Sequence, residues 1–158
     1  MGIEIERKFL VTSDAWRAGA RPGVRMTQGE LSRQPRRTVR VRVAGDNAWL
    51  TIKGAAEGIS RAEFEYPVPP QDAAGLLALC ELGSIDKTRY EVPFGDHVWE
   101  VDVFHGENDG LVVAEVELGD AHEKPLLPPW VGLEVSDDRR YANSSLTERP
   151  FRFWEQTE

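Results

Sequence analysis

The stretch IEIERKFLV (Ile3–Val11) alternates apolar and charged side chains with the period of a β-strand. Successive side chains of a strand point to opposite faces, so Glu4, Glu6 and Lys8 share one face. The two carboxylates then lie about 7 Å apart, which costs roughly 2 kcal/mol at an effective dielectric constant of about 20 if nothing lies between them. We therefore expect a cationic group beside this pair.

Alternation of the same period recurs along the chain and predicts a mainly β protein. The further strands are expected at Thr38–Val43, Trp49–Lys53, Arg61–Val68, Lys87–Val92, Val98–Phe104 and Leu111–Leu118. Most connections are too short for helical crossovers, which favours an antiparallel sheet or barrel. Helices are expected only at Gln71–Leu82, which stops at Gly83, and near Tyr141–Glu148, which Pro150 closes.

The length of 158 residues and the 41% hydrophobic composition predict one soluble domain over residues 1–158. We see no apolar run long enough to cross a membrane and no signal-peptide core, so a cytoplasmic location is expected. The net charge of −8 disfavours binding to nucleic acid or to an anionic membrane. The single cysteine, Cys80, lies in an apolar helical pattern and is expected to be an inert, buried thiol.

Every predicted strand is charged on one face, and the pairs of acids and the pairs of bases occupy separate strands. The basic strands carry Arg40 with Arg42, Lys53, and Lys87 with Arg89, and the acidic strands carry Glu63 with Glu65, Glu100 with Asp102, and Glu115 with Glu117. For any one pair of strands, a solvated outer face is the simpler interpretation. Like charges on a shared face raise the energy of the empty protein, however, and a divalent metal and a polyanion would relieve it. A sheet closed with this face inward would form a polar tunnel for a small, highly charged ligand.

Glu4-Ile5-Glu6-Arg7-Lys8 also fits an ExExK motif, and further segments follow it in order. These are QG (28–29), RTVRVR (37–42), AWLTIKG (48–54), GISRAEFEY (58–66), KTRYEVPFG (87–95), WEVDVFHGENDGLVVAEVEL (99–118) and RRYANSSL (139–146). Together they resemble the CYTH superfamily, the triphosphate tunnel metalloenzymes, in particular its short bacterial members similar to inorganic tripolyphosphatases. The resemblance implies a closed eight-stranded antiparallel β-barrel with a few flanking helices, whose lumen binds a linear triphosphate.

The same resemblance implies roles for individual residues. The expected ligands of Mg²⁺ or Mn²⁺ are Glu4, Glu6, Glu115, Glu117 and Asp102, with Glu63, Glu65 and Glu100 as further acids of the lumen. The expected triphosphate-binding residues are Lys8, Arg40, Arg42, Lys53, Lys87, Arg89 and Arg140. Lys8, Arg40, Lys87 and Glu117 are expected to be catalytic. One departure is Glu30, which stands at the expected tunnel rim where members usually carry an aromatic residue.

The function implied is metal-dependent hydrolysis of inorganic tripolyphosphate to pyrophosphate and phosphate. A thiamine triphosphatase or a class IV adenylate cyclase would need a pocket for thiazolium or adenine, and the sequence displays none. A polyphosphate-binding module without catalysis, or a purely structural charged sheet, are further alternatives. The expected partner is a small triphosphate, with no nucleic acid and no membrane, and a homodimer is left open. Neither a phosphate-binding P-loop motif nor histidines at zinc-site spacing occur.

Overall fold

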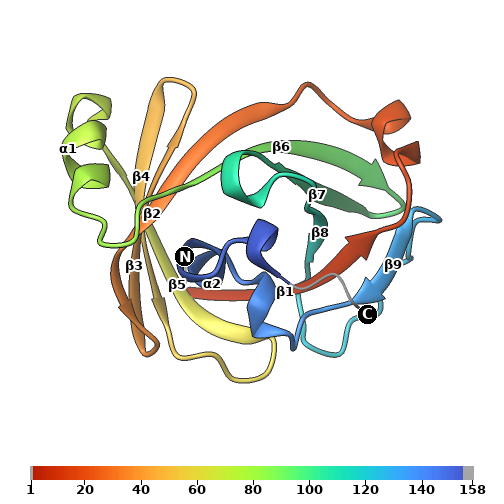
Figure 1. Cartoon of the computed structure of the whole chain (residues 1–158). Helices are drawn as coiled ribbons and strands as arrows, with labels where there is room; N and C mark the ends of the chain where they lie inside the picture. Colours follow the sequence, from red (N-terminus) through yellow and green to blue (C-terminus); the bar gives the residue numbers. More distant parts are fainter. Residues whose placement is uncertain (1, 155–158) are drawn as a thin grey trace.

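The computed structural model describes residues 2–154, and its strands are antiparallel and belong to one sheet. They are β1 (Gly2–Val11), β2 (Val24–Gln34), β3 (Arg37–Ala44), β4 (Asn47–Gly54), β5 (Ser60–Val68), β6 (Ile85–Phe94), β7 (His97–Phe104), β8 (Val112–Glu117) and β9 (Val131–Glu134). Along the sheet the order is β5-β4-β3-β2-β6-β7-β8-β1-β9, and β1 also pairs with β5. Eight strands therefore close into a ring, with β9 as an appendage of β1 (Figure 1), which confirms the predicted closed antiparallel arrangement.

Strand β1 closes the ring because its ten residues pair with three neighbours. Residues Gly2–Ile5 pair with β5, and Glu6–Leu10 pair with β8. The last part of the strand pairs with β9, with a register irregularity between Phe9 and Val11. The stretch that opens the chain is therefore the seam of the ring.

Two strands were not predicted, β2 and β9. In β2, the face that carries Met26, Gln28 and Glu30 is mostly polar, and Gly29 interrupts the other face, so no clear apolar alternation exists. Strand β9 has only four residues, too few for a periodic signal. Both strands become recognisable only through their pairing partners.

The helices are shorter than predicted. The segment predicted to be helical over Gln71–Leu82 contains a 3₁₀ turn, η2 (Pro70–Asp72), and a helix, α1 (Ala73–Ala78), without a side-chain cap. The second helix, α2 (Asn143–Glu148), follows the 3₁₀ turn η4 (Arg139–Tyr141), which replaces the predicted helical start at Tyr141. Further 3₁₀ turns are η1 (Ala15–Gly19), η3 (Gly106–Asn108) and η5 (Phe151–Phe153). None of the helices within residues 2–154 has the length and apolar character needed to cross a membrane.

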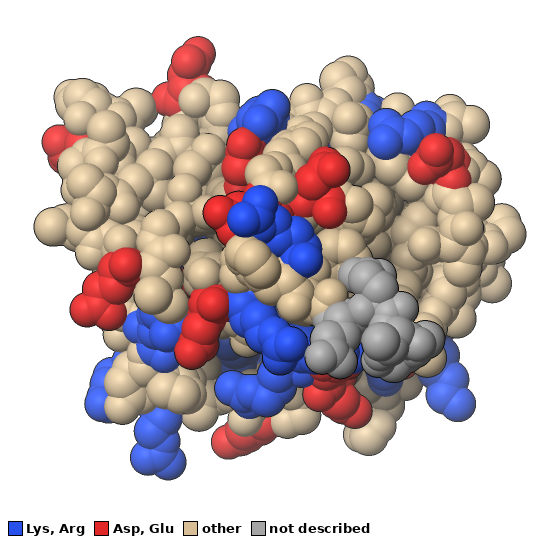
Figure 2. All heavy atoms as spheres, viewed as in Figure 1, with Lys and Arg blue, Asp and Glu red and all other residues tan. Residues whose placement is uncertain are grey.

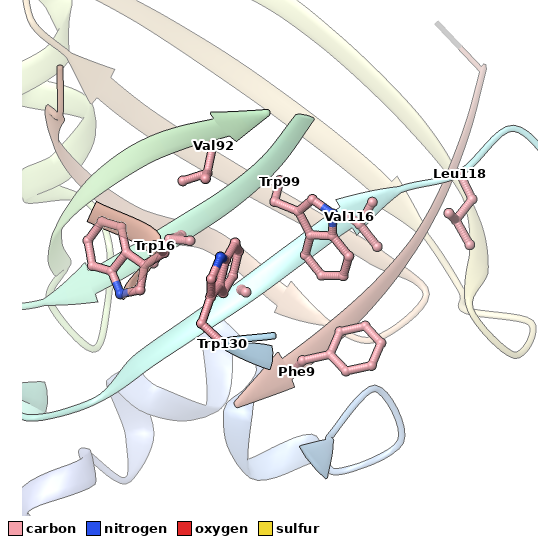
Figure 3. Close-up of a cluster of buried hydrophobic side chains, with 9 residues drawn as sticks. Phe9, Trp16, Val92, Trp99, Val116, Leu118 and Trp130 are labelled. Carbon is pink, nitrogen blue, oxygen red and sulfur yellow. The ribbon is translucent and has the colours of Figure 1, made fainter. Parts of the chain in front are cut away.

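One apolar core lies on the outer side of the ring, over β1, β6, β7 and β8. Trp99 is at its centre and is fully buried, with its ring centroid 5.5 Å from that of Phe9 and 5.9 Å from that of Trp130. Trp16 of η1 covers another part of the same cluster (Figure 3). The outward positions of these strands are thus apolar, which leaves their inward positions for the charged side chains.

A second apolar core closes one end of the ring. Ile85, Phe104 and Val113 stand two positions from Lys87, Asp102 and Glu115 along their strands and so share the inward face with them. Leu146 of α2 is fully buried and packs against this group together with Tyr141. Figure 1 shows α2 in the middle of the ring. The inward-facing apolar residues thus hold α2 as a plug, and the charged part of the interior lies beyond it.

Cys80 is buried, as predicted, and lies against β2 beyond the end of α1. A Cβ atom added at Gly29 would meet Cys80 Sγ and the carbonyl oxygen of Gly83, each at 2.8 Å. Glycine at position 29 therefore allows the Cys80–Gly83 segment to pack directly on the strand.

Candidate functional site

The charged faces of the predicted strands meet inside the ring. The residues on these faces are Glu4, Glu6 and Lys8 of β1, Arg40 and Arg42 of β3, Lys53 of β4, Glu63 and Glu65 of β5, Lys87 and Arg89 of β6, Glu100 and Asp102 of β7, and Glu115 and Glu117 of β8. Glu65 and Glu117 are the exposed members of this set. The register places acids opposite bases in several strand pairs, among them Lys8 with Glu115 and Lys53 with Glu63. Strand pairing therefore places acids of one strand beside bases of the next.

The most deeply buried group centres on Asp102. Lys87 Nζ donates to Asp102 Oδ2 at 2.8 Å, and Arg89 donates to both carboxylate oxygens at 2.8 and 2.9 Å. Burial opposes ionisation of Asp102, but Arg89 and Lys87 outweigh it and hold the pKa of this carboxyl well below its usual range. Burial lowers the pKa of Lys87 to about 7. The negative charge of Asp102 opposes this shift, whereas the positive charges of Arg89 and Arg42 add to it. Two basic side chains, Lys87 and Arg89, thus converge on a single fully buried carboxylate.

Glu115 joins this group to β1. It lies 3.4 Å from Arg89 Nη2 and 3.3 Å from Lys8 Nζ. Burial opposes its ionisation, but Lys8 and Arg89 lower the pKa of Glu115 below its ordinary value. Lys8 also donates to the backbone carbonyl of Tyr141 at 3.0 Å, which ties the lysine of the motif to the segment before α2.

A second group surrounds Glu4. Lys53 Nζ lies 2.9 Å from Glu4 Oε1 and 3.7 Å from Glu63 Oε2, and Arg61 Nε lies 3.6 Å from Glu4. Burial opposes ionisation of Glu4, but Lys53 outweighs it and lowers the pKa of this carboxyl. Arg61 was not predicted as a site residue, although its position two residues before Glu63 places both on one face of the strand.

The arginines of β3 form a third group. Arg40 Nη2 donates to Thr51 Oγ1 at 3.3 Å and lies 3.8 Å from Glu65 Oε2. Arg40 Nε is buried and has no hydrogen-bond partner within residues 2–154. Burial, together with Arg40 and Arg89, lowers the pKa of Arg42 to about 9. An unsatisfied donor and mutually repelling guanidiniums are the conditions under which a bound anion stabilises a site.

Glu30 belongs near this third group. It is opposite Arg40 in the register of β2 and β3 and is half-buried. Burial raises the pKa of Glu30, and the nearby Arg40 and Arg33 offset this only in part. The residue that departs from the expected pattern thus places a carboxyl beside a predicted phosphate-binding arginine.

Two polar residues of this interior were missed by the sequence analysis. Gln28 Oε1 accepts a hydrogen bond from Arg42 Nε at 2.8 Å, and Gln28 is almost fully buried. Asn143, the first residue of α2, accepts from Lys87 Nζ at 3.1 Å. Both lie in segments that carry the family resemblance, QG and RRYANSSL, but a neutral amide gives no charge pattern from which to assign a role.

In the part of the chain that the structure describes, Arg140 pairs with a carboxylate of its own segment. Its guanidinium pairs with Asp138, with a shortest distance of 2.6 Å, and its side chain is 60% exposed. The structure thus places it on the surface beside Asp138, outside the interior groups described above.

The acidic residues near the seam have the donor chemistry for a hard divalent cation. Glu6 and Glu117 are direct partners in the register of β1 and β8. Burial, then Glu115 and Glu4, raises the pKa of Glu6 well above its usual value. Burial, then Glu4 and Glu63, raises the pKa of Glu117. Residues 2–154 contain no group of three or more such side chains already converged on one point. Hard divalent cations prefer carboxylate oxygens, and a dication would relieve the repulsion between these side chains.

A cavity of about 510 Å³ lies next to the arginines. Its lining residues are Pro22, Val24, Met26, Arg42, Ala44, Trp49, Glu65, Arg89, Glu91 and Glu100. Apolar side chains and an indole thus adjoin two predicted phosphate-binding bases, an arrangement that the sequence analysis did not find. The face in Figure 2, viewed as in Figure 1, shows basic and acidic side chains side by side around its middle.

Comparison with known proteins places this arrangement in context. The model of the CYTH domain matches residues 2–149. An inorganic triphosphatase of Acetivibrio thermocellus is 46% identical over 153 residues, which cover 96% of this chain and 97% of the relative. An inorganic triphosphatase of Nitrosomonas europaea is 36% identical over 148 residues, which cover 90% of this chain and 95% of the relative. A solved structure of an inorganic triphosphatase superposes with a TM-score of 0.62 at 31% identity, covering 90% of this chain and 96% of the other.

Proposed function

This chain belongs to the CYTH domain family, and from that premise we propose that it hydrolyses inorganic triphosphate to pyrophosphate and phosphate. The observation that carries the proposal is the ring interior, where Lys87, Arg89, Arg42 and Arg40 crowd together. Among residues 2–154, Arg42 has no ion pair within 4.0 Å and the buried Arg40 Nε has no hydrogen-bond partner. A linear triphosphate brings several negative charges and many acceptor oxygens to such a site. Two relatives named inorganic triphosphatase match nearly the whole chain, which supports the same substrate.

The bases are proposed to bind the substrate as follows. Arg40, Arg42 and Arg89 offer planar forks for phosphate oxygens, and Lys8, Lys53 and Lys87 act as point charges. Asp102 and Glu115 already hold Lys87, Arg89 and Lys8 by ion pairs of 2.8 to 3.4 Å. These two acids therefore position the cations before substrate arrives, besides any share they take in binding metal. Arg140 keeps its proposed phosphate contact only if its side chain leaves Asp138.

A divalent cation, Mg²⁺ or Mn²⁺, is proposed to bind at Glu4, Glu6 and Glu117. Glu6 and Glu117 fit this role best, because the pKa of each is raised and a bound dication would lower it again. When bound, such a cation neutralises phosphate charge and polarises an attacking water. Lys8, Lys87 and the arginines stabilise the negative charge that develops on the leaving pyrophosphate. Glu63, Glu65 and Glu100 complete the acidic lining and restrain the neighbouring bases.

A second candidate function follows from the cavity beside Arg42 and Arg89. Trp49 and Met26 form an apolar wall next to these bases, so an organic triphosphate has room for a ring system there. Under this alternative, fold and reaction stay the same, and thiamine triphosphate or a nucleoside triphosphate is the preferred substrate. The acidic composition and single cysteine support a cytoplasmic enzyme with a small-molecule substrate, without nucleic acid or membrane as partners.

The test is release of phosphate from tripolyphosphate, thiamine triphosphate and ATP, each with Mg²⁺, Mn²⁺ or EDTA. Arg42→Gln is the test variant, and Arg21→Gln is the matched control because Arg21 pairs with Glu91 and its side chain is 53% exposed. We expect rapid, metal-dependent release from tripolyphosphate, a large loss in Arg42→Gln and little change in Arg21→Gln. Preference for an organic triphosphate would support the second candidate. Tight binding without release from any substrate would refute the hydrolase and leave a binding module.

A further inference from the structure

The plug helix α2 contributes a side chain to the interior site. Asn143 Oδ1 accepts hydrogen bonds from Lys87 Nζ at 3.1 Å and from Gln28 Nε2 at 3.4 Å. Gln28 Oε1 in turn accepts from Arg42 Nε at 2.8 Å. We infer that Asn143 is a positioning residue that holds the ammonium of Lys87 and, through Gln28, the guanidinium of Arg42 for triphosphate binding. The inference deepens the proposed function and rests on it.

The chemistry of the donors fixes both amide orientations. Arg42 and the ammonium form of Lys87 have only donors, so each faces an amide oxygen. With the oxygen of Gln28 turned to Arg42, its NH₂ group points to the oxygen of Asn143, which also faces Lys87. The series of hydrogen bonds that links Lys87 to Arg42 therefore has a single consistent direction. Reversing either amide would place two donors opposite each other.

The start of α2 is held in place independently of these bonds. Leu146 is fully buried in the second apolar core. Arg33 of β2 donates to Ser144 O at 3.3 Å and to Glu148 Oε1 at 2.9 Å. Asn143 therefore stands on a frame that is packed and tied to the ring, as a positioning residue requires.

A neutral acceptor suits this position. The ammonium of Lys87 has three N–H groups, and Asp102 and Asn143 accept two of them. The third has no hydrogen-bond acceptor within residues 2–154, where the ring centroid of Phe104 lies 5.6 Å from Nζ, and we propose that it meets a phosphate oxygen. Asn143 orients the lysine without adding negative charge, whereas a second carboxylate would hold Lys87 equally well but compete with an anionic substrate for it.

The first test observes the lysine directly, without substrate. The ¹⁵N ammonium signal of Lys87 is recorded in mildly acidic solution and assigned by its disappearance in Lys87→Met. We expect Asn143→Ala to shift or remove this signal and Asn143→Asp to retain it. The matched control is Asn108→Ala, because buried Asn108 also holds the C-terminal segment, accepting from Phe151 N at 2.8 Å, but has no hydrogen bond to an interior base within residues 2–154. An unchanged Lys87 signal in Asn143→Ala, or an equal change in Asn108→Ala, would overturn the inference.

The second test measures kcat and KM for tripolyphosphate. Loss of a buried hydrogen bond to a charged group predicts a fall in kcat/KM on the order of tenfold in Asn143→Ala, against less than about twofold in Asn108→Ala. Asn143→Asp should raise KM although it keeps the Lys87 signal. Wild-type activity in Asn143→Ala would contradict a positioning role. If the wild-type chain hydrolyses no triphosphate, the proposed function fails, and the ammonium signal still decides whether Asn143 holds Lys87.

Discussion

Glu4 Oε1 lies 2.9 Å from Lys53 Nζ, although Glu4 is on β1 and Lys53 is on β4, with β5 between the two strands. This lysine is the cationic group that was expected beside Glu4 and Glu6 from their mutual repulsion. Glu6 itself has no ion pair within 4.0 Å among residues 2–154, and burial with Glu115 and Glu4 raises its pKa. The ring therefore neutralises one of the two carboxylates of the first strand and leaves the other for a further cation.

Removal of Lys53 should destabilise the protein strongly. Lys53→Met leaves Glu4, whose side chain is only 11% exposed, without its nearest counter-charge. Breaking a buried pair in this way predicts a loss of about 3 kcal/mol in the free energy of unfolding at neutral pH, measured by urea denaturation. Arg61→Met is the control and should cost less, because Arg61 is 35% exposed and lies 3.6 Å from Glu4. Equal losses in the two variants would argue against Lys53 as the main partner.

Divalent metal should stabilise the chain through Glu6. A metal that binds only the native state stabilises it, by about 2.7 kcal/mol when the free metal concentration is 100 times its Kd. The melting temperature rises accordingly. We expect Glu6→Gln to lose most of this rise with Mn²⁺ or Mg²⁺ and EDTA to abolish it in the wild type. Glu57→Gln, at an exposed turn, serves as the charge-matched control. A full metal-induced rise in Glu6→Gln would exclude Glu6 as a ligand.

Gly29→Ala should lower stability, and Gly75→Ala should raise it. At position 29 a Cβ would stand 2.8 Å from both Cys80 Sγ and Gly83 O, and this overpacking predicts a loss of about 1–3 kcal/mol. At position 75, within α1, a new Cβ would meet no atom within 4 Å beyond its chain neighbours and the backbone of the helix itself. The higher helix propensity of alanine therefore predicts a gain of up to about 1 kcal/mol. Melting temperatures of the two variants give the comparison. The same sign for both would contradict the packing argument.

The pair of Arg25 and Asp86 should make a pH-dependent contribution to stability. Arg25 donates to both oxygens of Asp86, at 2.6 and 2.7 Å, and these hydrogen bonds lower the pKa of Asp86. The native state therefore binds the proton less readily than the unfolded state, so the contribution is complete above the ordinary pKa of aspartate and disappears as pH falls through the lowered one. The urea concentration at the midpoint of unfolding should differ between wild type and Asp86→Asn at neutral pH. In strong acid the two midpoints should become equal. Because both side chains are well exposed, the difference should be smaller than for Lys53→Met. A constant difference across this range would exclude the ion pair as its cause.

The strands that could be predicted are those whose two faces differ. In β1, β3 and β7 the apolar and charged positions alternate, and this local period is sufficient to place Lys8, Arg40 and Asp102 on charged faces. Strand β2 has no such contrast, because Gln28 and Glu30 face a polar interior. The same polar interior that makes the site thus hides one of its strands.

The sequence by itself determined the antiparallel β character, the charged strand faces and the membership of the family, because these depend on neighbouring residues and on short motifs. Only the tertiary structure decided which charges neutralise one another and how α2 closes the ring. Gln28 and Asn143, which hold Arg42 and Lys87, are 115 positions apart in the chain. Such a contact depends on ring closure and on the packing of Leu146, so no local sequence pattern predicts it.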